Sequence, residues 1–203
     1  MTDRVRGAVL AGGAASRFGG RPKGLERVGG QRILDYVVAN LRQATGQPPL
    51  LVANAADAET WYPGLQVARD LLPQRGSLGG IYTAVMAAPA PVLVVAWDMP
   101  FVPVPLLRSL IEGLNGFDVF LPESGGKRAV EPLCAVYGPA CGPAIRERLD
   151  QEDYRAIGFH DAVRVGTLSL EAVSRHGDPA LLFYNVNTAE ELAEAEAMWQ
   201  RRG

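Results

Sequence analysis

The sequence predicts an α/β fold with a doubly wound, mostly parallel central sheet that is flanked by helices. In the N-terminal half, short apolar runs alternate with segments of helical periodicity, which is the order of βαβ units. One run, residues 91–96, is apolar throughout instead of alternating, as expected for a parallel strand that is covered on both faces. Because the ligands of such sheets gather at the carboxyl ends of the strands, the polar residues that follow the apolar runs are candidates for a functional site.

The composition is that of an ordinary soluble protein, and we expect a single domain. Of the 203 residues, 48% are hydrophobic and 21% are charged, and the net charge of -2 predicts no basic surface for a nucleic acid. Charged residues, Pro or Gly interrupt each apolar run before it reaches the length of a membrane span, and no basic segment precedes an apolar one at the N-terminus. We therefore expect a cytoplasmic protein without a membrane or nucleic-acid partner. Cys134 and Cys141 lack the spacing of a zinc site or a disulfide framework.

The first apolar run, residues 5–10, predicts a buried strand that leads into a glycine-rich loop, residues 10–23. Glycine lets backbone N–H groups approach an anion closely, and Arg17 and Lys23 add positive charge, so the loop is predicted to bind a polyphosphate. Its spacing fits neither the P-loop pattern nor the G-x-G-x-x-G dinucleotide fingerprint. The alternative is a flexible loop that carries two solvated cations.

Polar side chains follow the next two predicted strands, Asn54 after the first and Asp70 after the second. Both strands are short and apolar, and each is preceded by a segment that favours a helix. In order, these elements are a helix over residues 31–43, a strand over 50–53, a short helix over 57–62 and a strand over 65–68.

A further helix opens at residues 77–80, which places Arg75 and Gly76 just before a helix N-terminus, where an anion or a ligand carbonyl is favoured. The strand predicted over residues 91–96 then stops at Asp98. Parallel strands present their carboxyl ends at one edge of a sheet, so we expect Asp98, the two earlier polar side chains and the glycine-rich loop to lie close together.

The C-terminal half is less regular. Its clearest signal is the start of the last helix, where Thr188 and Glu191 have the spacing of a capping box. The other elements predicted there are helices over residues 105–114 and 139–149, strands over 118–121, 133–136 and 163–168, and a segment over 183–187 that leads into the last helix.

Asp98 is the candidate metal ligand. Magnesium in proteins is often held by one carboxylate together with substrate phosphates and waters, and a carboxylate that faces the glycine-rich loop would meet that need. Arg17 and Lys23 would offset the charge of the phosphates, so these residues are suited to displacement at a phosphorus atom. Asp98 is also in a position to act as a turn former or helix N-cap ahead of Met99 and Pro100, and the two roles are compatible.

Several segments together resemble the molybdenum cofactor guanylyltransferase family, usually called MobA, from about residue 6 to about residue 198. The resemblance implies a single Rossmann-like nucleotidyltransferase domain over residues 1–203, with a nucleotide-binding half over about 1–103 and an acceptor-binding half over about 104–203. The segments are Leu10-Ala11-Gly12-Gly13, Ser16-Arg17-Phe18-Gly19, Lys23, Gly76-Ser77-Leu78-Gly79-Gly80, Asp98-Met99-Pro100-Phe101-Val102-Pro103, residues 132–137 and residues 185–192.

The activity implied by this resemblance is the Mg²⁺-dependent transfer of GMP from GTP to the terminal phosphate of molybdopterin, or of its molybdenum-loaded form. Pyrophosphate is released, and a molybdopterin guanine dinucleotide cofactor is formed. The resemblance also implies transient contacts with other cofactor-biosynthesis proteins and with apo-molybdoenzymes.

The resemblance assigns three catalytic residues, Arg17, Lys23 and Asp98, with Asp98 as the metal ligand and Lys23 on the triphosphate. Asn185 and Asn187 would approach from the acceptor side. The residues that it assigns to nucleotide binding are Leu10, Ala11, Gly12, Gly13, Lys23, Asn54, Asp70 and Asp98.

Three positions depart from the family pattern. Pro22 stands before Lys23, as in cytidylyl relatives, whereas a glycine at position 12 resembles the guanine-selective loop and leaves room for a purine. Glu131 stands where many relatives have His, and Trp97 stands where a smaller residue is common. The alternatives are therefore a CTP-dependent molybdopterin cytidylyltransferase, another small-molecule or sugar-phosphate nucleotidyltransferase, and a non-catalytic nucleotide-binding protein.

Overall fold

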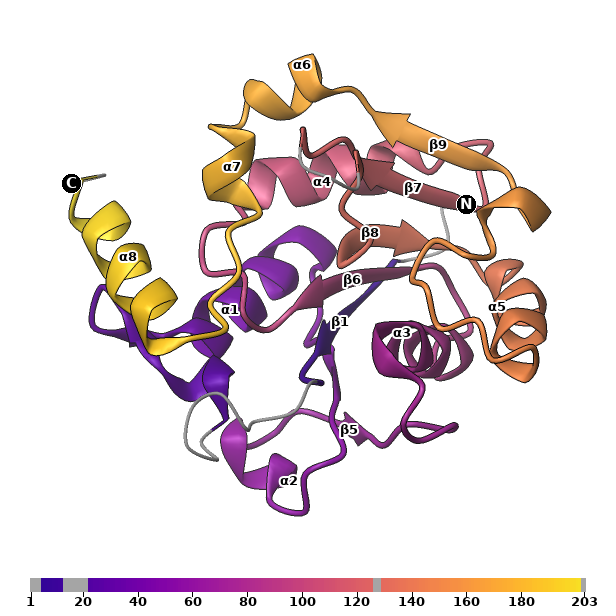
Figure 1. Ribbon diagram of the computed structural model, residues 1–203, viewed down its shortest axis with the longest axis horizontal. Coiled ribbons are helices and arrows are strands. Elements are labelled where there is room, and N and C mark those ends of the chain that lie inside the picture. The colour runs from indigo at the N-terminus through magenta and orange to yellow at the C-terminus, as the bar shows by residue number, and fades with distance from the viewer. Residues whose placement is uncertain (1–4, 13–21, 126–128, 202–203) are drawn as a thin grey trace.

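A computed structural model describes residues 5–12, 22–125 and 129–201 of the chain. Its centre is a seven-stranded sheet in the order β5-β4-β1-β6-β8-β7-β9 (Figure 1). Only β8 runs antiparallel to its neighbours among these strands, so the predicted mostly parallel α/β sheet is confirmed. The strands are β1 (Arg6–Leu10), β4 (Leu50–Val52), β5 (Val67–Ala68), β6 (Val92–Ala96), β7 (Val119–Pro122), β8 (Cys134–Tyr137) and β9 (Val165–Leu168).

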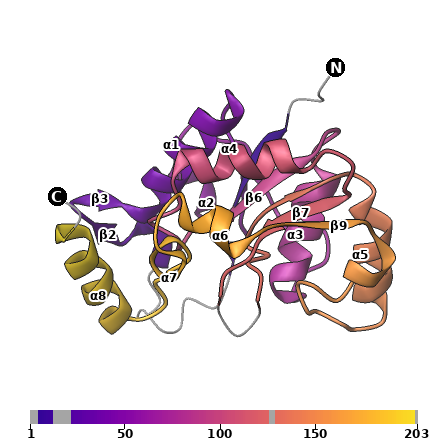
Figure 2. The same ribbon diagram turned by 90° about the horizontal axis from the view of Figure 1, so that it is seen from above.

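Two pairs of helices cover the sheet, one pair on each face (Figure 2). Helices α1 (Ile33–Thr45) and α4 (Val104–Gly113) pack on one face, and α3 (Gly76–Met86) and α5 (Cys141–Asp150) pack on the other. All five residues of β6 are buried, with Leu93 and Val95 in one core cluster and Val92 and Val94 in the other. This explains why the β6 sequence is apolar throughout.

Short elements complete the fold, and most of them are absent from the sequence-based prediction. The first predicted helix begins at Ile33 and not at residue 31, because Gln31–Arg32 forms strand β3, which pairs with β2 (Arg27–Val28). Strands of two residues and helices of one turn are too short to show a periodicity. The others are η2 (Lys23–Leu25), α2 (Ala58–Trp61), η3 (His160–Ala162), α6 (Leu170–Ser174) and α7 (Pro179–Leu182).

The last helix, α8 (Ala189–Gln200), begins with the predicted capping box between Thr188 and Glu191. It packs beside the β2–β3 hairpin, which directly follows the turn that carries Lys23 (Figure 2). The Glu196 carboxylate accepts a hydrogen bond from the N–H of Gly29 at 2.7 Å. A Cβ at Gly29 would lie 2.2 Å from Nε1 of Trp199, so glycine permits this close approach. None of the helices in the described residues combines the length and apolarity needed to cross a membrane.

An ion pair joins β9 to β7 at the edge of the sheet. Arg164 donates from Nη2 to Oδ1 of Asp118 at 2.8 Å and from Nε to Oδ2 at 3.0 Å. These bonds lower the pKa of Asp118 from 3.8 to about 2. Because the pKa is lower in the folded state than in the unfolded chain, the pair stabilises the protein above pH 4, and this contribution is lost as the pH falls towards 2.

We expect Asp118→Asn to lower the melting temperature at pH 7 by about 2–4 °C, since it removes a pair with one well-exposed partner. The difference from the wild-type protein should shrink as the pH falls through the range between the two pKa values. Thermal melts followed by circular dichroism at a series of pH values would test this. A difference that stays constant down to pH 2 would show that Asp118 stabilises the fold by other means.

Candidate active site

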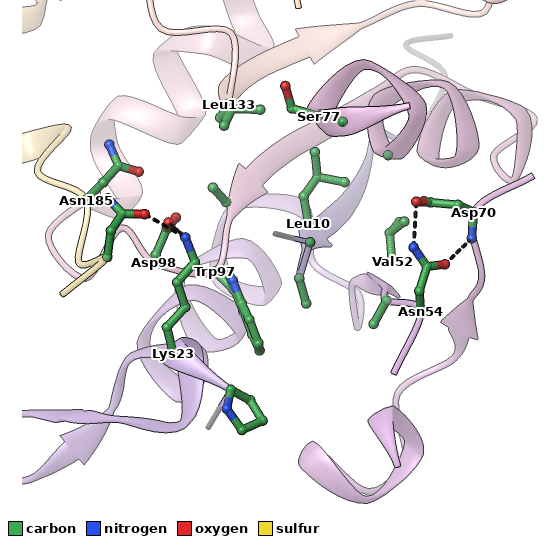
Figure 3. A pocket seen from close by; sticks show the side chains of 18 of the residues that line it. Leu10, Lys23, Val52, Asn54, Asp70, Ser77, Trp97, Asp98, Leu133 and Asn185 are labelled. Atoms are coloured by element: carbon green, nitrogen blue, oxygen red, sulfur yellow. Dashed lines mark hydrogen bonds and ion pairs between the residues drawn. The ribbon is translucent and has the colours of Figure 1, made fainter. Parts of the chain in front are cut away.

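A cleft of about 1120 Å³ opens at the carboxyl ends of β1, β4 and β6 (Figure 3). It contains every described residue to which the family resemblance assigns a role, whereas Gly13 and Arg17 lie outside the described residues. The predicted residues that line the cleft are Leu10, Ala11, Gly12, Lys23, Asn54, Asp70, Asp98, Asn185 and Asn187.

Lys23 lies between two polar side chains at one end of the cleft (Figure 3). Its Nζ forms an ion pair with Oδ2 of Asp98 and donates a hydrogen bond to Oδ1 of Asn187 at 2.8 Å. The side chains of Lys23 and Asp98 are only 19% and 7% exposed. Residues from the N-terminal loop, the end of β6 and the start of α8 therefore meet at this point.

Backbone contacts hold this end of the cleft together. The N–H of Val186 donates to the carbonyl of Asp98 at 3.0 Å, which ties the C-terminal segment to the end of β6. The Glu191 carboxylate, part of the capping box, accepts from the N–H of Asn187 at 2.6 Å and from the N–H of Thr188 at 3.0 Å. The N-terminus of α8 thus fixes Asn187 where its amide oxygen reaches Lys23. Asn185 lines the cleft nearby and donates to the carbonyl of Phe183 at 2.9 Å.

One oxygen of Asp98 fits a cation. Its Oδ1 is buried and has no hydrogen-bond partner among the described residues. A buried carboxylate oxygen without a donor is costly, and a divalent cation would satisfy it. Residues 5–12, 22–125 and 129–201 hold no cluster of three or more His, Cys, Asp or Glu side chains suited to a metal. A single carboxylate suits a metal such as magnesium, which takes its other ligands from phosphates and water.

Asn54 and Asp70 form a reciprocal pair at the opposite end of the cleft (Figure 3). The Asn54 amide donates to Oδ2 of Asp70 at 2.6 Å, and its Oδ1 accepts from the N–H of Asp70 at 2.8 Å. Arg69 donates to the carbonyl of Asn54 at 3.1 Å. This end of the cleft thus presents amide and carboxylate groups whose orientation is already set by hydrogen bonds.

The backbone of residues 10–12 forms the floor between the two ends. The N–H of Ala11 donates to the carbonyl of Val52 at 2.9 Å, and the carbonyl of Leu10 accepts from the N–H of Trp97 at 3.2 Å. Gly12 is exposed, and a Cβ built there would meet no atom of the described residues within 4 Å. The floor is therefore continuous with β1.

Other residues in the cleft were not singled out as site residues from the sequence. Trp61 belongs to the one-turn helix α2, and Trp97, like Glu131, is one of the positions that depart from the family pattern. Gly76 and Ser77 line the cleft at the start of α3, in agreement with the predicted helix N-terminus there. The C-terminal half adds Ser124, Val130, Glu131 and Leu133.

Groups that gave no functional signal in the sequence lie outside the cleft lining. His176 is paired with the hydroxyl of Ser109 at 3.2 Å, and His160 packs edge-on against Phe159. The two cysteines are buried and free, and burial raises the pKa of Cys141 to about 12. Such thiols stay protonated at neutral pH, so they are unsuited to nucleophilic or metal-binding roles.

The sequence of this chain matches a known protein family. Residues 7–165, well over half of the chain, match the family model described as MobA-like NTP transferase domain. The chain belongs to the MobA-like NTP transferase family. A molybdenum cofactor guanylyltransferase from Desulfosudis oleivorans is 35% identical over 198 residues, which cover 96% of this chain and 96% of the relative.

Solved structures support the same fold. Molybdopterin-guanine dinucleotide biosynthesis protein A from Archaeoglobus fulgidus aligns with a TM-score of 0.81 at 23% identity, over 97% of this chain and all of that one. A Mycobacterium tuberculosis protein in complex with manganese aligns with a TM-score of 0.68 at 16% identity, over 97% of this chain and 100% of that chain. This MobA-like NTP transferase therefore has the Rossmann-like nucleotidyltransferase architecture that its sequence predicts.

Proposed function

We propose that this chain transfers GMP from GTP to the terminal phosphate of molybdopterin, or of Mo-molybdopterin, and releases pyrophosphate. The product would be molybdopterin guanine dinucleotide. Relatives named molybdenum cofactor guanylyltransferase, with 35% identity over nearly the whole chain, support this assignment. The observation that carries it is one cleft with Lys23 and Asp98 at one end and the Asn54–Asp70 pair at the other.

The nucleotide would lie along the floor of the cleft, with its guanine and ribose against the backbone of residues 10–12. Asn54 and Asp70 would contact the base or ribose at their end. Guanine carries N–H donors beside a carbonyl acceptor, and a carboxylate together with an amide can accept from the former and donate to the latter. The fixed orientation of the Asn54–Asp70 pair favours one arrangement of donors and acceptors.

The triphosphate would extend to the opposite end, where Lys23 would bind it and Asp98 would hold Mg²⁺. The buried, unpartnered Oδ1 of Asp98 supports that metal role. When bound, Mg²⁺ would neutralise charge on the phosphate oxygens. Arg17, which lies outside the described residues, is proposed to offset phosphate charge as well.

The chemistry would be an in-line displacement at the α-phosphorus. An oxygen of the acceptor phosphate forms the new P–O bond while the bond to the β-phosphate oxygen breaks, and pyrophosphate leaves towards Lys23. A phosphate monoester is already largely ionised near neutral pH, so no side chain is required as a general base. The protein's task is therefore positioning and charge stabilisation. Asn185 would contact the acceptor, while Asn187 would orient Lys23.

We place this enzyme in the cytoplasm, in transient contact with other cofactor-biosynthesis proteins and with apo-molybdoenzymes. The family membership is the support for these partners.

A CTP-dependent cytidylyltransferase is the second candidate. Pro22 directly precedes Lys23, as in the sequence pattern of cytidylyl relatives, and both residues line the cleft. Measuring pyrophosphate release with GTP, CTP, ATP and UTP in the presence of molybdopterin separates the two. Strict dependence on CTP would overturn the guanine assignment.

Gly12→Ala provides a sharper test of the base site. Among the residues that the structure describes, the added methyl would meet no atom within 4 Å, so we expect the variant to keep its melting temperature. The methyl would instead enter the space assigned to the purine. We expect kcat/KM for GTP to fall by about 10- to 100-fold, with a smaller loss for CTP. Equal losses with both nucleotides would place the base elsewhere.

A further inference from the structure

Gly24, the residue directly after Lys23 in η2, is buried against the indole ring of Trp97. A Cβ built on Gly24 would lie 2.4 Å from Cε3, 2.6 Å from Cδ2 and 3.0 Å from Cγ of that ring. These distances are shorter than a carbon–carbon contact allows, so any larger residue at position 24 must move the turn or the ring. The turn that carries Lys23 therefore rests directly on Trp97.

Trp97 itself is firmly placed. The residue is 4% exposed, and its ring stacks on Trp61, with ring centroids 5.1 Å apart and an interplanar angle of 23°. The Nε1 atoms of both tryptophans are buried and have no hydrogen-bond partner among the described residues. An indole N–H without a partner costs free energy, so these two N–H groups do not stabilise the fold. The ring pair stabilises it through the packing of the two rings.

Trp97 is also the residue before Asp98, at the end of β6. Its backbone N–H donates to the carbonyl of Leu10, so the same residue is joined to the floor of the cleft. Trp97 is thus connected to both charged residues. It is bonded to Asp98 along the backbone, and its ring contacts Gly24, the residue next to Lys23.

We propose that Trp97 is a positioning residue that sets the separation between the Lys23 ammonium and the Asp98 carboxylate, with Trp61 supporting its ring. This inference rests on the proposed roles of Lys23 and Asp98 in binding the triphosphate and its metal. It predicts that substitutions at positions 97 and 24 have non-additive effects on kcat/KM for GTP. A change to either one is expected to alter GTP use through Lys23. Gly24 does not line the cleft, so a substitution at position 24 acts without a contact to the substrate.

The test is a double-mutant cycle of Gly24→Ala and Trp97→Ala, with kcat, KM for GTP, and GTP binding by calorimetry measured for each variant. We expect each single substitution to lower kcat/KM by about 10²-fold, the loss typical of a displacement of about 1 Å. Because both act through the same contact, the double variant should lose no more than the worse single one. Trp97→Phe, which keeps a ring against Gly24, should retain most of the activity.

Gly113→Ala is the matched control. Gly113 lies in α4 and also packs on an aromatic ring, since its Cβ would be 2.1 Å from Cε1 of Phe120, but neither residue lines the cleft. This variant should lower the melting temperature and leave kcat and KM unchanged. The inference is overturned if Gly24→Ala behaves in the same way, or if the losses at positions 24 and 97 multiply to about 10⁴-fold.

Lys23→Met separates failure of this inference from failure of the proposed function. If Lys23→Met is inactive while Gly24→Ala has normal kinetics, Lys23 has its proposed role and only the positioning inference fails. If Lys23→Met is fully active, the proposed role of Lys23 is wrong and the positioning inference is wrong with it. Should Trp97→Ala fail to fold, Trp97→Phe, Gly24→Ala and the Gly113→Ala control still decide the question.

Discussion

Replacing Asp98 by asparagine is expected to lower kcat/KM for GTP by about 10³-fold, the upper range for loss of one electrostatic group in an active site. The described residues offer no other carboxylate beside Lys23, so the substitution removes the only proposed protein charge for the metal. Asparagine has nearly the same shape and its amide oxygen can still accept a hydrogen bond from Lys23. We therefore expect the fold to persist.

Two measurements distinguish loss of the metal from loss of structure. Binding of Mn²⁺, followed by electron paramagnetic resonance in the presence of GTP, should weaken in Asp98→Asn while the circular dichroism spectrum stays unchanged. Asp150→Asn is the control, because Asp150 is an exposed carboxylate on α5 that is paired with Arg146. Normal turnover in Asp98→Asn would remove Asp98 from the mechanism, and equal losses in both variants would point to a general effect of charge.

Replacing Lys23 by methionine is expected to lower kcat/KM for GTP by about 10²–10³-fold. Methionine keeps much of the length of the side chain but lacks the ammonium group that is proposed to meet the triphosphate. The same substitution should strengthen binding of a metal ion to Asp98. Lys23 occupies Oδ2 of Asp98 in the structure, so its removal leaves both carboxylate oxygens available to a cation.

We therefore expect Lys23→Met to bind Mn²⁺ more tightly than the wild-type protein when no nucleotide is present, and to bind GTP more weakly. Calorimetric titrations with each ligand would measure the two effects separately. Arg146→Met is the control. It removes one positive charge from α5, outside the cleft lining, and should change neither the affinity for Mn²⁺ nor the affinity for GTP. Weaker binding of both ligands in Lys23→Met would indicate that Lys23 supports Asp98 instead of competing with the metal for it.

The residues at the strand ends were predictable because they depend on local pattern. The β6 sequence is apolar at every position, which indicates a strand buried on both faces, and Asp98 follows two positions after its last residue, Ala96. Asn54 and Asp70 follow parallel strands in the same way, and the structure places them together in the cleft. Parallel strands share one carboxyl edge, so a sequence that identifies the strands also identifies that edge.

The sequence alone also determined the start of α8, since a capping box joins residues only three positions apart. It could not predict that the capped segment brings Asn187 to Lys23, which lies 164 positions away. It likewise gave no reason for a glycine at position 24, because Gly24 lies in a three-residue turn and its ring contact comes from Trp97.

The difference has a physical cause. Strand burial, helix caps and strand ends depend on periodicity and on hydrogen bonds between near neighbours, which the sequence displays directly. The environment of Lys23 depends on how α8, the end of β6 and the Trp61–Trp97 stack pack around one turn, and close packing of distant segments leaves no local pattern in the chain. The sequence thus identified the polar residues that follow the strands, and only the tertiary structure decided which groups hold Lys23 in place.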